Sequence, residues 1–311
     1  MKSNGNPAPQ GAGEEGTDAF LEFDRFWSSP DVSALPNIMT CDVEDYFQVS
    51  AFEKIIDKDS WSTWECRIPQ NVDLILQMMD EAGTLGTFFT LGWVAENHPE
   101  VVRRIADAGH EIASHGMLHV RIFDMSATQF RDEVTRSKHL LEDVSGQAVN
   151  GFRAASWSFD RRTPWAHAIL AEAGYRYSSS VYPISHDHYG VPDAPTRPFY
   201  VKDTDILEIP ASVTRAFGRN LPSAGGGYFR LMPLSASRWL IQRARVMNES
   251  PAIFYFHPWE LDPDQPRVAG ATAKSRFRHY LNLHRFEGRF RRLLSQFDWG
   301  RLDWAFLPEL T

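Results

Sequence analysis

The sequence predicts an α/β fold built around a mainly parallel β-sheet. Two observations support this prediction. Short apolar runs alternate along the chain with longer segments that have helical spacing, and polar residues directly follow several of the apolar runs. A repeated order of strand and helix gives parallel strands, and functional residues gather where the carboxyl ends of such strands meet.

The first half of the chain supplies most of the alternation. Predicted strands lie within 36–50 and at 86–91, 111–114, 151–153 and 175–178, and predicted helices lie at 71–82, 99–108, 126–144 and 164–173. Pro99 opens one helix, and glycines follow three of the four, which are the positions that these two residues favour. The acids, histidines and arginine discussed below all follow predicted strands.

The alternation of strands and helices stops in the segment 183–233, which is rich in Pro, Gly, Asp and aromatic residues. We expect a long irregular insert there, and such inserts are usually functional or form a lid. A strand at 253–256 restores the pattern, and the C-terminal extension, 271–311, is expected to contain one long helix at 279–297. The whole of 19–311 is predicted to be one domain, preceded by a disordered leader at 1–18.

Composition excludes some classes of protein. A formal net charge of −8 and an isoelectric point near 5.8 argue against a nucleic-acid partner, because phosphate binding requires a basic face. No apolar run is long enough for a membrane span, and the first 18 residues contain no secretory signal. We expect a cytoplasmic chain, unless a longer precursor is trimmed, with Cys41 and Cys66 as free thiols. The sequence leaves the oligomeric state open.

Three carboxylates, Asp42, Glu44 and Asp45, lie at the end of the first predicted strand. Burial and mutual repulsion would raise some of their pKa values unless a cation lies among them. One acid can then bind a metal while another serves as a base. Acidic loops after strands are common, so this pattern is weak by itself.

His115 and His119 form the second pattern. Histidines four residues apart in a helical or near-helical turn project from one face and can take two positions around a divalent ion. Two histidines and one carboxylate leave positions open for water and substrate, as a hydrolytic metal site requires. The alternative is a pair of capping or core histidines.

Arg153 and His257 complete the set of candidates. The Arg153 guanidinium, at a predicted strand end, can pair with a carboxylate and keep it ionised. His257, among aromatic residues at another strand end, can donate a proton to a leaving amine, although a buried structural histidine is an equal alternative.

The order of these motifs resembles that of the polysaccharide deacetylases, also called the NodB-homology group or carbohydrate esterase family four. The resemblance covers about residues 36–305 and rests on the acids from Asp42 to Asp45, the two histidines, Arg153, the segment 174–180 and His257. The segments 42–47, 225–230 and 278–297 resemble one branch of that family, which is associated with exosortase and exopolysaccharide gene clusters.

The resemblance implies a distorted (β/α)7 barrel, similar to a TIM barrel, and a divalent metal, with zinc as the expected ion. It also implies a role for each motif residue. Asp42 matches the base, His115 and His119 match the metal histidines, Arg153 matches the arginine that positions the base, and His257 matches the acid.

Three positions depart from the family pattern. Val43 stands where the family usually has a second aspartate, so the metal carboxylate is expected to be Glu44 or Asp45. Strand alternation favours Glu44 and a turn after the strand favours Asp45, and the sequence leaves this choice open. Ala155 replaces a usual proline after Arg153, and Ser178 replaces a common aspartate of the fourth motif.

The expected function is removal of N-acetyl groups from N-acetylhexosamine units of a polysaccharide or lipid-linked glycan, in exopolysaccharide biosynthesis. Several aromatic residues near the motifs are candidates for stacking on sugars: Tyr46, Phe47, Trp157, Tyr228, Phe229 and Trp259. Two alternatives remain. One is an amidase acting on peptidoglycan or a small cyclic amide, and the other is a catalytically silent glycan-binding protein of the same fold.

Overall fold

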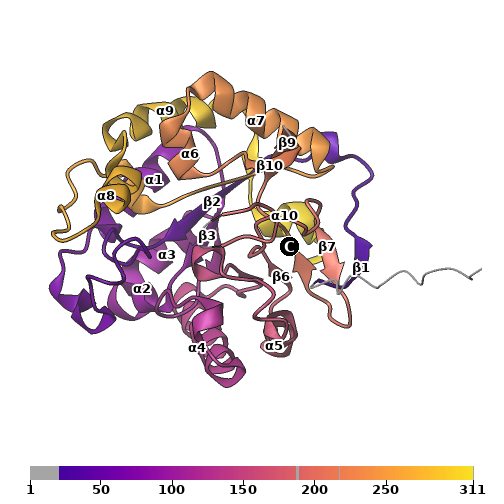
Figure 1. Cartoon of the computed structure of the whole chain (residues 1–311), viewed down its shortest axis with the longest axis horizontal. Coiled ribbons are helices and arrows are strands. Elements are labelled where there is room, and N and C mark those ends of the chain that lie inside the picture. Colours follow the sequence, from indigo (N-terminus) through magenta and orange to yellow (C-terminus); the bar gives the residue numbers. More distant parts are fainter. Residues whose placement is uncertain (1–20, 187–188, 217, 311) are drawn as a thin grey trace, which may run out of the picture.

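The computed structural model describes residues 21–186, 189–216 and 218–310. The predicted leader, 1–18, therefore lies outside the described residues. The described chain has the predicted α/β fold, in which helices surround a mostly parallel central sheet (Figure 1). None of its helices combines the length and the apolar character that crossing a bilayer requires. Both cysteines are free thiols, as expected.

In the described residues the main sheet has ten strands in the order β1-β7-β8-β6-β5-β4-β3-β2-β11, with β12 beside β2. The parallel strands are β2 (Asn37–Val43), β3 (Thr87–Thr90), β4 (Glu111–Ser114), β5 (Gly151–Phe152), β6 (Tyr177–Ser178), β8 (Leu207–Glu208), β11 (Ile253–Phe256) and β12 (Trp299–Gly300). At one edge, β7 (Phe199–Val201) and β1 (Phe23–Phe26) pair antiparallel. The arrangement is that of a distorted barrel.

The helices lie outside this sheet. Those of the first half are α1 (Ile68–Glu81), α2 (Gly92–Asn97), α3 (Pro99–Asp107), α4 (Ala127–Ser145) and α5 (Ala166–Glu172), and those of the second half are α6 (Gly226–Leu231), α7 (Leu234–Met247), α8 (Ala273–Tyr280), α9 (Phe286–Leu294) and α10 (Leu302–Phe306). The α4 helix begins with a capping box between Ser126 and Gln129 and ends at Gly146 in the left-handed region. The predicted strands and helices of the first half are thus confirmed, with small shifts of their ends.

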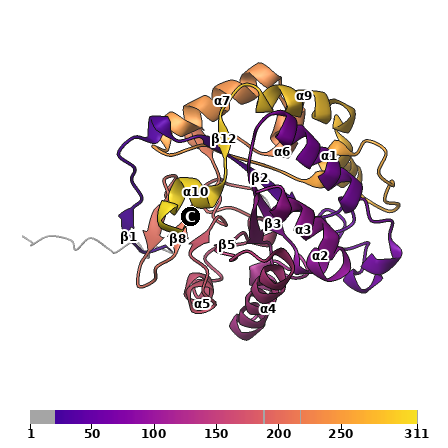
Figure 2. The ribbon, with the colours of Figure 1, turned by 180° about the vertical axis from the view of Figure 1, so that it is seen from behind.

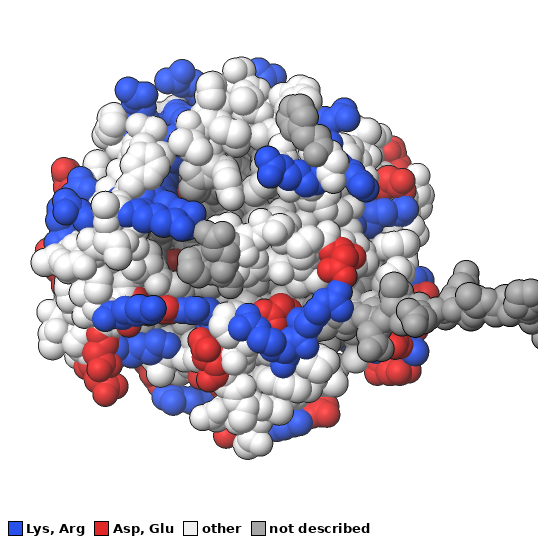
Figure 3. Space-filling model, in the orientation of Figure 1, with Lys and Arg blue, Asp and Glu red and all other residues white. Residues whose placement is uncertain are grey.

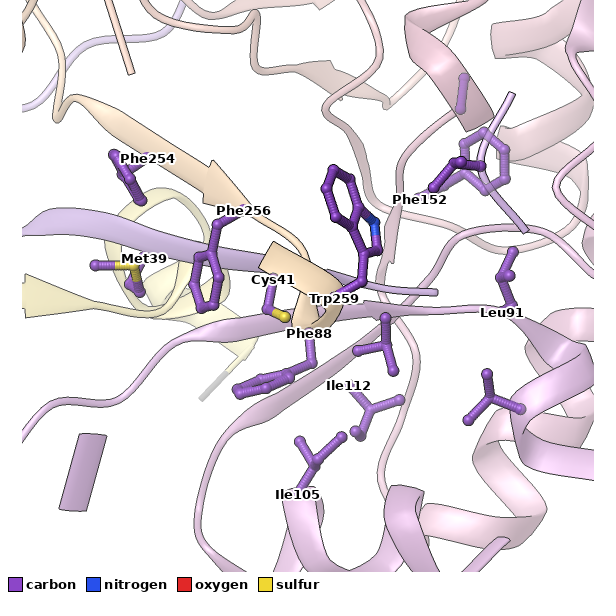
Figure 4. Packing of buried hydrophobic residues seen from close by; sticks show 14 of the residues in the cluster. Met39, Cys41, Phe88, Leu91, Ile105, Ile112, Phe152, Phe254, Phe256 and Trp259 are labelled. Carbon is purple, nitrogen blue, oxygen red and sulfur yellow. The ribbon is translucent and has the colours of Figure 1, made fainter. Parts of the chain in front are cut away.

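Strand alternation divides the core into two layers. Met39 and Cys41 of β2 pack with Phe254 and Phe256 of β11 in the layer between sheet and helices (Figure 4). The neighbouring residue Ile38 belongs instead to a second cluster inside the barrel, whose members include Phe89, Ala113, Tyr177, Leu207 and Ile253. Side chains on a strand alternate between faces, so Asp42, four residues after Ile38, also faces the barrel interior.

The segment 183–233 is more regular than the sequence predicted. It contributes β7 and β8 to the main sheet, forms the hairpin of β9 (Val213–Ala216) and β10 (Arg219–Pro222), and contains helix α6. The chain on either side of this hairpin lies against β11, since the Ser212 hydroxyl accepts a hydrogen bond from Ile253 N and Tyr255 N donates to Ala224 O. The expectation of an irregular insert was wrong because its short strands lack clear alternation.

The prediction of one long helix at 279–297 was also wrong. The chain breaks after α8, where Asn282 has a φ of 53°, and α9 starts at Phe286. The break lets Phe286 and Phe290 reach the core beneath Phe256, with ring centroids 6.1 and 4.5 Å from it. A continuous helix would carry these rings elsewhere.

The α10 helix closes the amino-terminal end of the barrel (Figure 2). Its first N–H groups, at Leu302 and Asp303, donate to the side chains of Thr87 and Glu111 at the starts of β3 and β4. The carboxyl ends of the strands therefore form the end at which a site can open.

We predict that His110 makes the fold sensitive to acid. Its Nδ1 accepts a hydrogen bond from Gly86 N, and burial, with a smaller effect of Arg301, lowers its pKa from 6.5 to about 4. The unfolded chain therefore takes up a proton first as the pH falls, and stability is lost between about pH 6.5 and 4. From pH 7 to pH 5 this loss amounts to about 2 kcal/mol.

Urea unfolding at pH 7 and pH 5 tests this prediction, with His110→Gln as the comparison. The variant should be less stable at pH 7 but should lose about 2 kcal/mol less than the parent chain between the two pH values. Equal losses would show that another group causes the acid sensitivity.

Candidate metal centre

The two predicted metal histidines lie in the loop after β4 rather than in a helical turn. Gly116 and His119 both adopt positive φ angles, 78° and 51°, and bend the loop back toward the strand. The Glu133 carboxylate on α4 accepts hydrogen bonds from Met117 N and Leu118 N at 2.9 and 3.1 Å. The expected helical geometry was therefore wrong, although the loop still brings both imidazoles together, with ring centroids 5.3 Å apart.

Glu44, His115 and His119 form a compact group of donor atoms. One ligand atom from each lies within 4.8 Å of the others, and all three residues are buried. His115 Nδ1 lies 2.8 Å from Arg153 O, an acceptor, so it carries the proton and leaves Nε2 free for a metal. Glu44 Oε2 lies 2.9 Å from His119 Nε2 but has no hydrogen-bond partner among the described residues. Two imidazoles and an unsatisfied buried carboxylate oxygen fit a divalent cation.

The protonation states also suit a cation. Burial would raise the pKa of Glu44, but the neighbouring histidines, led by His119, lower it to about 2. Burial lowers the pKa of His115 to about 4. At neutral pH the carboxylate is therefore ionised and the imidazole is neutral, which are the forms that bind metal.

Asp45 lies outside this group. Its Oδ2 accepts hydrogen bonds from Arg67 N and Ile68 N, at 2.6 and 3.2 Å, and its Oδ1 accepts from Tyr46 N. The carboxylate thus satisfies the free N–H groups at the start of α1. Of the two candidate metal carboxylates that the sequence left open, the geometry favours Glu44. Asp45 instead caps the start of α1.

Asp42 is held inside the barrel by Arg153. Arg153 Nη1 donates to Asp42 Oδ1 at 2.7 Å and to the Thr40 hydroxyl at 2.9 Å. The guanidinium is completely buried and lies 4.0 Å from the Phe89 ring centroid, and its Nε and Nη2 donate to the carbonyl and hydroxyl oxygens of Ser179. The arrangement fixes the orientation of the Asp42 carboxylate.

The loop that carries Ser179 has a support that the sequence analysis missed. Glu208 is fully buried, accepts hydrogen bonds from Ser180 N and Val181 N, and pairs with His167 Nε2 at 2.9 Å. The Ser178 hydroxyl donates to Ser180 Oγ. In the sequence, Glu208 is a single acid in a segment where no strand is predicted. That signal is too weak to identify it as a functional residue.

The His257 imidazole faces the carboxylates of Asp42 and Glu44. Its Nε2 lies 3.6 Å from Glu44 Oε1 and 4.0 Å from Asp42 Oδ2, while its Nδ1 lies 3.3 Å from Glu260 Oε2. Burial would lower the pKa of His257, but Glu260, Glu44 and Asp42 together raise it to about 9. The imidazole is therefore protonated at neutral pH in this structure.

A cavity of about 440 Å³ opens beside His119. Its walls come largely from the segment after β2 and include Ser50, Lys54, Lys58 and Trp61. Four of the six aromatic candidates for sugar stacking are poorly suited to that role because their side chains are 7% exposed or less: Trp157, Trp259, Tyr46 and Phe229. Phe47 is also buried but borders the cavity, and Tyr228 is partly exposed.

Comparison with known proteins divides the chain into two matched regions. Residues 54–178 match the family model described as polysaccharide deacetylase, and residues 179–307 match a domain of unknown function (DUF3473). The first region contains both histidines and Arg153. The second contains His257 and Glu260, while Asp42 and Glu44 precede both regions.

Among curated proteins, the chain is similar to a peptidoglycan deacetylase of Helicobacter pylori, with 29% identity over 44% of this chain and 51% of that protein. It is also similar to a chitooligosaccharide deacetylase of Sinorhizobium fredii, with 34% identity over 31% of this chain and 46% of that protein. The chain thus spans about half the length of these relatives.

Solved structures support the fold. A crystal structure from Mycobacterium smegmatis, provisionally described as a polysaccharide deacetylase, superposes with a TM-score of 0.57 and 21% identity over 90% of this chain and 91% of that one. A peptidoglycan N-acetylglucosamine deacetylase superposes with a TM-score of 0.50 and 13% identity, also over 90% and 91%. At these identities the likeness concerns the fold alone.

We predict that Glu44→Gln and His119→Ala abolish stable metal binding, whereas Asp45→Asn retains it. Loss of an outer partner of a metal ligand costs about 10- to 100-fold in affinity, so loss of a ligand itself should cost more than about 100-fold. Elemental analysis of dialysed protein measures the metal content per chain.

His139→Ala, at an exposed position of α4, is the matched control and should keep the metal. Metal retained in Glu44→Gln but lost in Asp45→Asn would contradict the placement of the site.

Proposed function

We propose that this chain, which carries a polysaccharide deacetylase region at residues 54–178, is a metal-dependent hydrolase that removes N-acetyl groups from N-acetylhexosamine units of a polysaccharide. One observation carries the proposal. Two further groups border the cluster formed by Glu44, His115 and His119. One is the Asp42 carboxylate, which Arg153 holds, and the other is the protonated imidazole of His257.

Glu44, His115 and His119 would hold the divalent metal, for which zinc is the ion we propose, since a set of two imidazoles and one carboxylate suits it. When bound there, the cation supplies Lewis-acid polarisation of the acetamide carbonyl and acidifies water. The three protein ligands leave room for substrate and water, because each offers one donor atom.

Asp42 acts as the base in this proposal. Arg153 Nη1 donates a hydrogen bond to Asp42 Oδ1, which leaves Oδ2 to accept a proton from the attacking water. The oxygen of that water forms a bond to the acetyl carbon. Backbone N–H groups near Ala155 or Ser156 are the candidate donors to the resulting oxyanion.

His257 acts as the acid. Its Nε2 points toward Asp42 and Glu44, so its proton is available on the side where the amide nitrogen would lie. Breaking of the C–N bond transfers that proton to the departing amine, and the products are acetate and a free amino sugar.

An extended glycan is the substrate that we favour, in exopolysaccharide biosynthesis, as a polysaccharide or a lipid-linked glycan. The cavity beside His119 adjoins the metal group and offers space for neighbouring sugars. On the face shown in Figure 3, Lys and Arg side chains lie around the middle, although the chain carries a net charge of −8.

Two alternatives have specific support. The peptidoglycan deacetylase among the similar proteins favours a peptidoglycan substrate, for which the same residues would have the same roles. The replacement of a fourth-motif aspartate by Ser178 is the observation that favours a catalytically silent glycan-binding protein. The contacts of Asp42 with Arg153 and of His257 with Glu260 oppose it, because a binding protein has no need to orient a base and an acid.

Acetate release from N-acetylglucosamine oligomers, peptidoglycan and acetylated exopolysaccharide, compared with ring opening of small cyclic imides, tests the proposal. We expect acetate release, its loss on chelation and its recovery with zinc. Ring opening without acetate release would favour the small-amide alternative, and intact metal with neither reaction would favour the silent one.

Asp42→Asn should lower kcat for acetate release by about 100- to 10,000-fold while metal content stays unchanged, because an amide cannot accept the proton. Acetate release and metal content are measured on the same preparation.

Asp205→Asn, at an exposed position before β8, is the control and should keep full activity. Full activity of Asp42→Asn would exclude Asp42 as the base.

A further inference from the structure

We propose that Glu260 and Arg230, both in the region that matches a domain of unknown function, position the imidazole of His257 for proton donation, with Gly226 providing the space for the Glu260 carboxylate. This proposal rests on the proposed deacetylase function and adds a role for residues to which the resemblance assigns none.

Glu260 contacts both the backbone and the ring of His257. Glu260 lies three residues after His257 in the turn η5 (Pro258–Leu261) and is completely buried. Its Oε2 accepts a hydrogen bond from His257 N at 3.1 Å and lies 3.3 Å from His257 Nδ1. One oxygen thus holds both the backbone and the ring of the histidine, and Nε2 is directed toward Asp42 and Glu44.

The other oxygen of the Glu260 carboxylate is bound by Arg230. Arg230 Nε donates to Glu260 Oε1 at 2.8 Å, and both side chains are 2% exposed or less. The rest of the Arg230 guanidinium donates to His279 O, Leu281 O and Arg278 O at the end of α8. These last three acceptors are backbone carbonyl oxygens, so they fix the guanidinium, which in turn holds the carboxylate in one position.

Gly226 starts helix α6 and lies four residues before Arg230, on the same face of the helix. A Cβ atom at this position would lie 1.9 Å from Glu260 Oε2. The carboxylate therefore packs directly on the backbone of Gly226. At Gly227, by contrast, a Cβ atom would meet nothing within 4 Å.

A stack of rings restricts His257 further. The Trp259 ring stacks on the His257 ring, with centroids 5.1 Å apart and planes at 19°. The His279 ring also stacks on the Trp259 ring, with centroids 4.1 Å apart and planes at 17°. His279 Nε2 is hydrogen-bonded to Gln265 Oε1 at 2.6 Å. Stacking fixes the plane of the imidazole, and Glu260 fixes its rotation within that plane.

Glu260→Gln tests the proposal with little change of shape. An amide has only one oxygen, so Arg230 and His257 cannot both keep an acceptor. For N-acetyl substrates we expect kcat to fall by about 10- to 100-fold with KM and metal content unchanged, the size of effect seen when outer partners of a site are lost. For 4-nitrophenyl acetate we expect a fall below about threefold, because nitrophenolate leaves without a proton.

Gly226→Ala should shift the same two reactions in the same direction, since the added methyl group displaces the carboxylate. Gly227→Ala is the matched control on the same helix and should leave both reactions unchanged. Equal losses for amide and ester in Glu260→Gln, or no loss for either, would overturn the proposal.

NMR of the His257 ring nitrogens provides a second measurement that needs no substrate. The parent chain and Gly227→Ala should show a hydrogen-bonded Nδ1–H, and Glu260→Gln and Gly226→Ala should change that signal. A parent chain that releases no acetate would refute the deacetylase function while this measurement still decides the positioning of His257. Unchanged ring signals in both variants would refute the positioning role.

Discussion

The buried pair of Arg153 and Asp42 is the interaction on which the site depends. Removing a guanidinium from water is costly unless its N–H groups find acceptors, and Arg153 donates four hydrogen bonds, to Asp42, Thr40 and Ser179. The same residue also accepts the ring proton of His115 through its carbonyl oxygen. One residue therefore orients both the proposed base and a proposed metal ligand, and a displacement of Arg153 would disturb both.

The site needs both matched regions of the chain. The region of residues 54–178 supplies His115, His119 and Arg153, whereas the proposed acid, His257, and the residues proposed to position it, Glu260 and Arg230, come from the region of residues 179–307. Parallel pairing of β11 with β2 brings the two sets together, since it places the end of the IFYF strand beside the end of the strand that carries Asp42. The second region thus completes the barrel and the site at once.

Three residues at this end of the barrel have strained backbone conformations. His119, Ser156 and Trp157 all have positive φ angles between 51° and 54°, although none is a glycine. Such conformations persist only where surrounding contacts hold them, and they cluster at functional sites. Here the contacts are the Glu133 carboxylate beneath the histidine loop and the packing of Trp157 against Tyr182 and Tyr255.

The sequence by itself determined the parallel α/β fold of the first half, because apolar periodicity and the Pro and Gly signals at helix ends are local properties of the chain. It also determined that the candidate residues lie at strand ends. It did not identify the strands between 183 and 233, which are too short to show alternation, or the break at Asn282, which follows from the packing of Phe286 and Phe290.

Only the tertiary structure favours Glu44 over Asp45 as the proposed metal carboxylate, because the difference depends on the start of α1, 22 residues further along, whose N–H groups engage Asp45. Only the tertiary structure revealed Arg230 behind Glu260, because these residues lie 30 positions apart and no periodicity links them. The local pattern of apolar and polar residues indicates which face of a strand or helix a side chain takes. The partner of that side chain often lies in a distant segment, which only folding brings near.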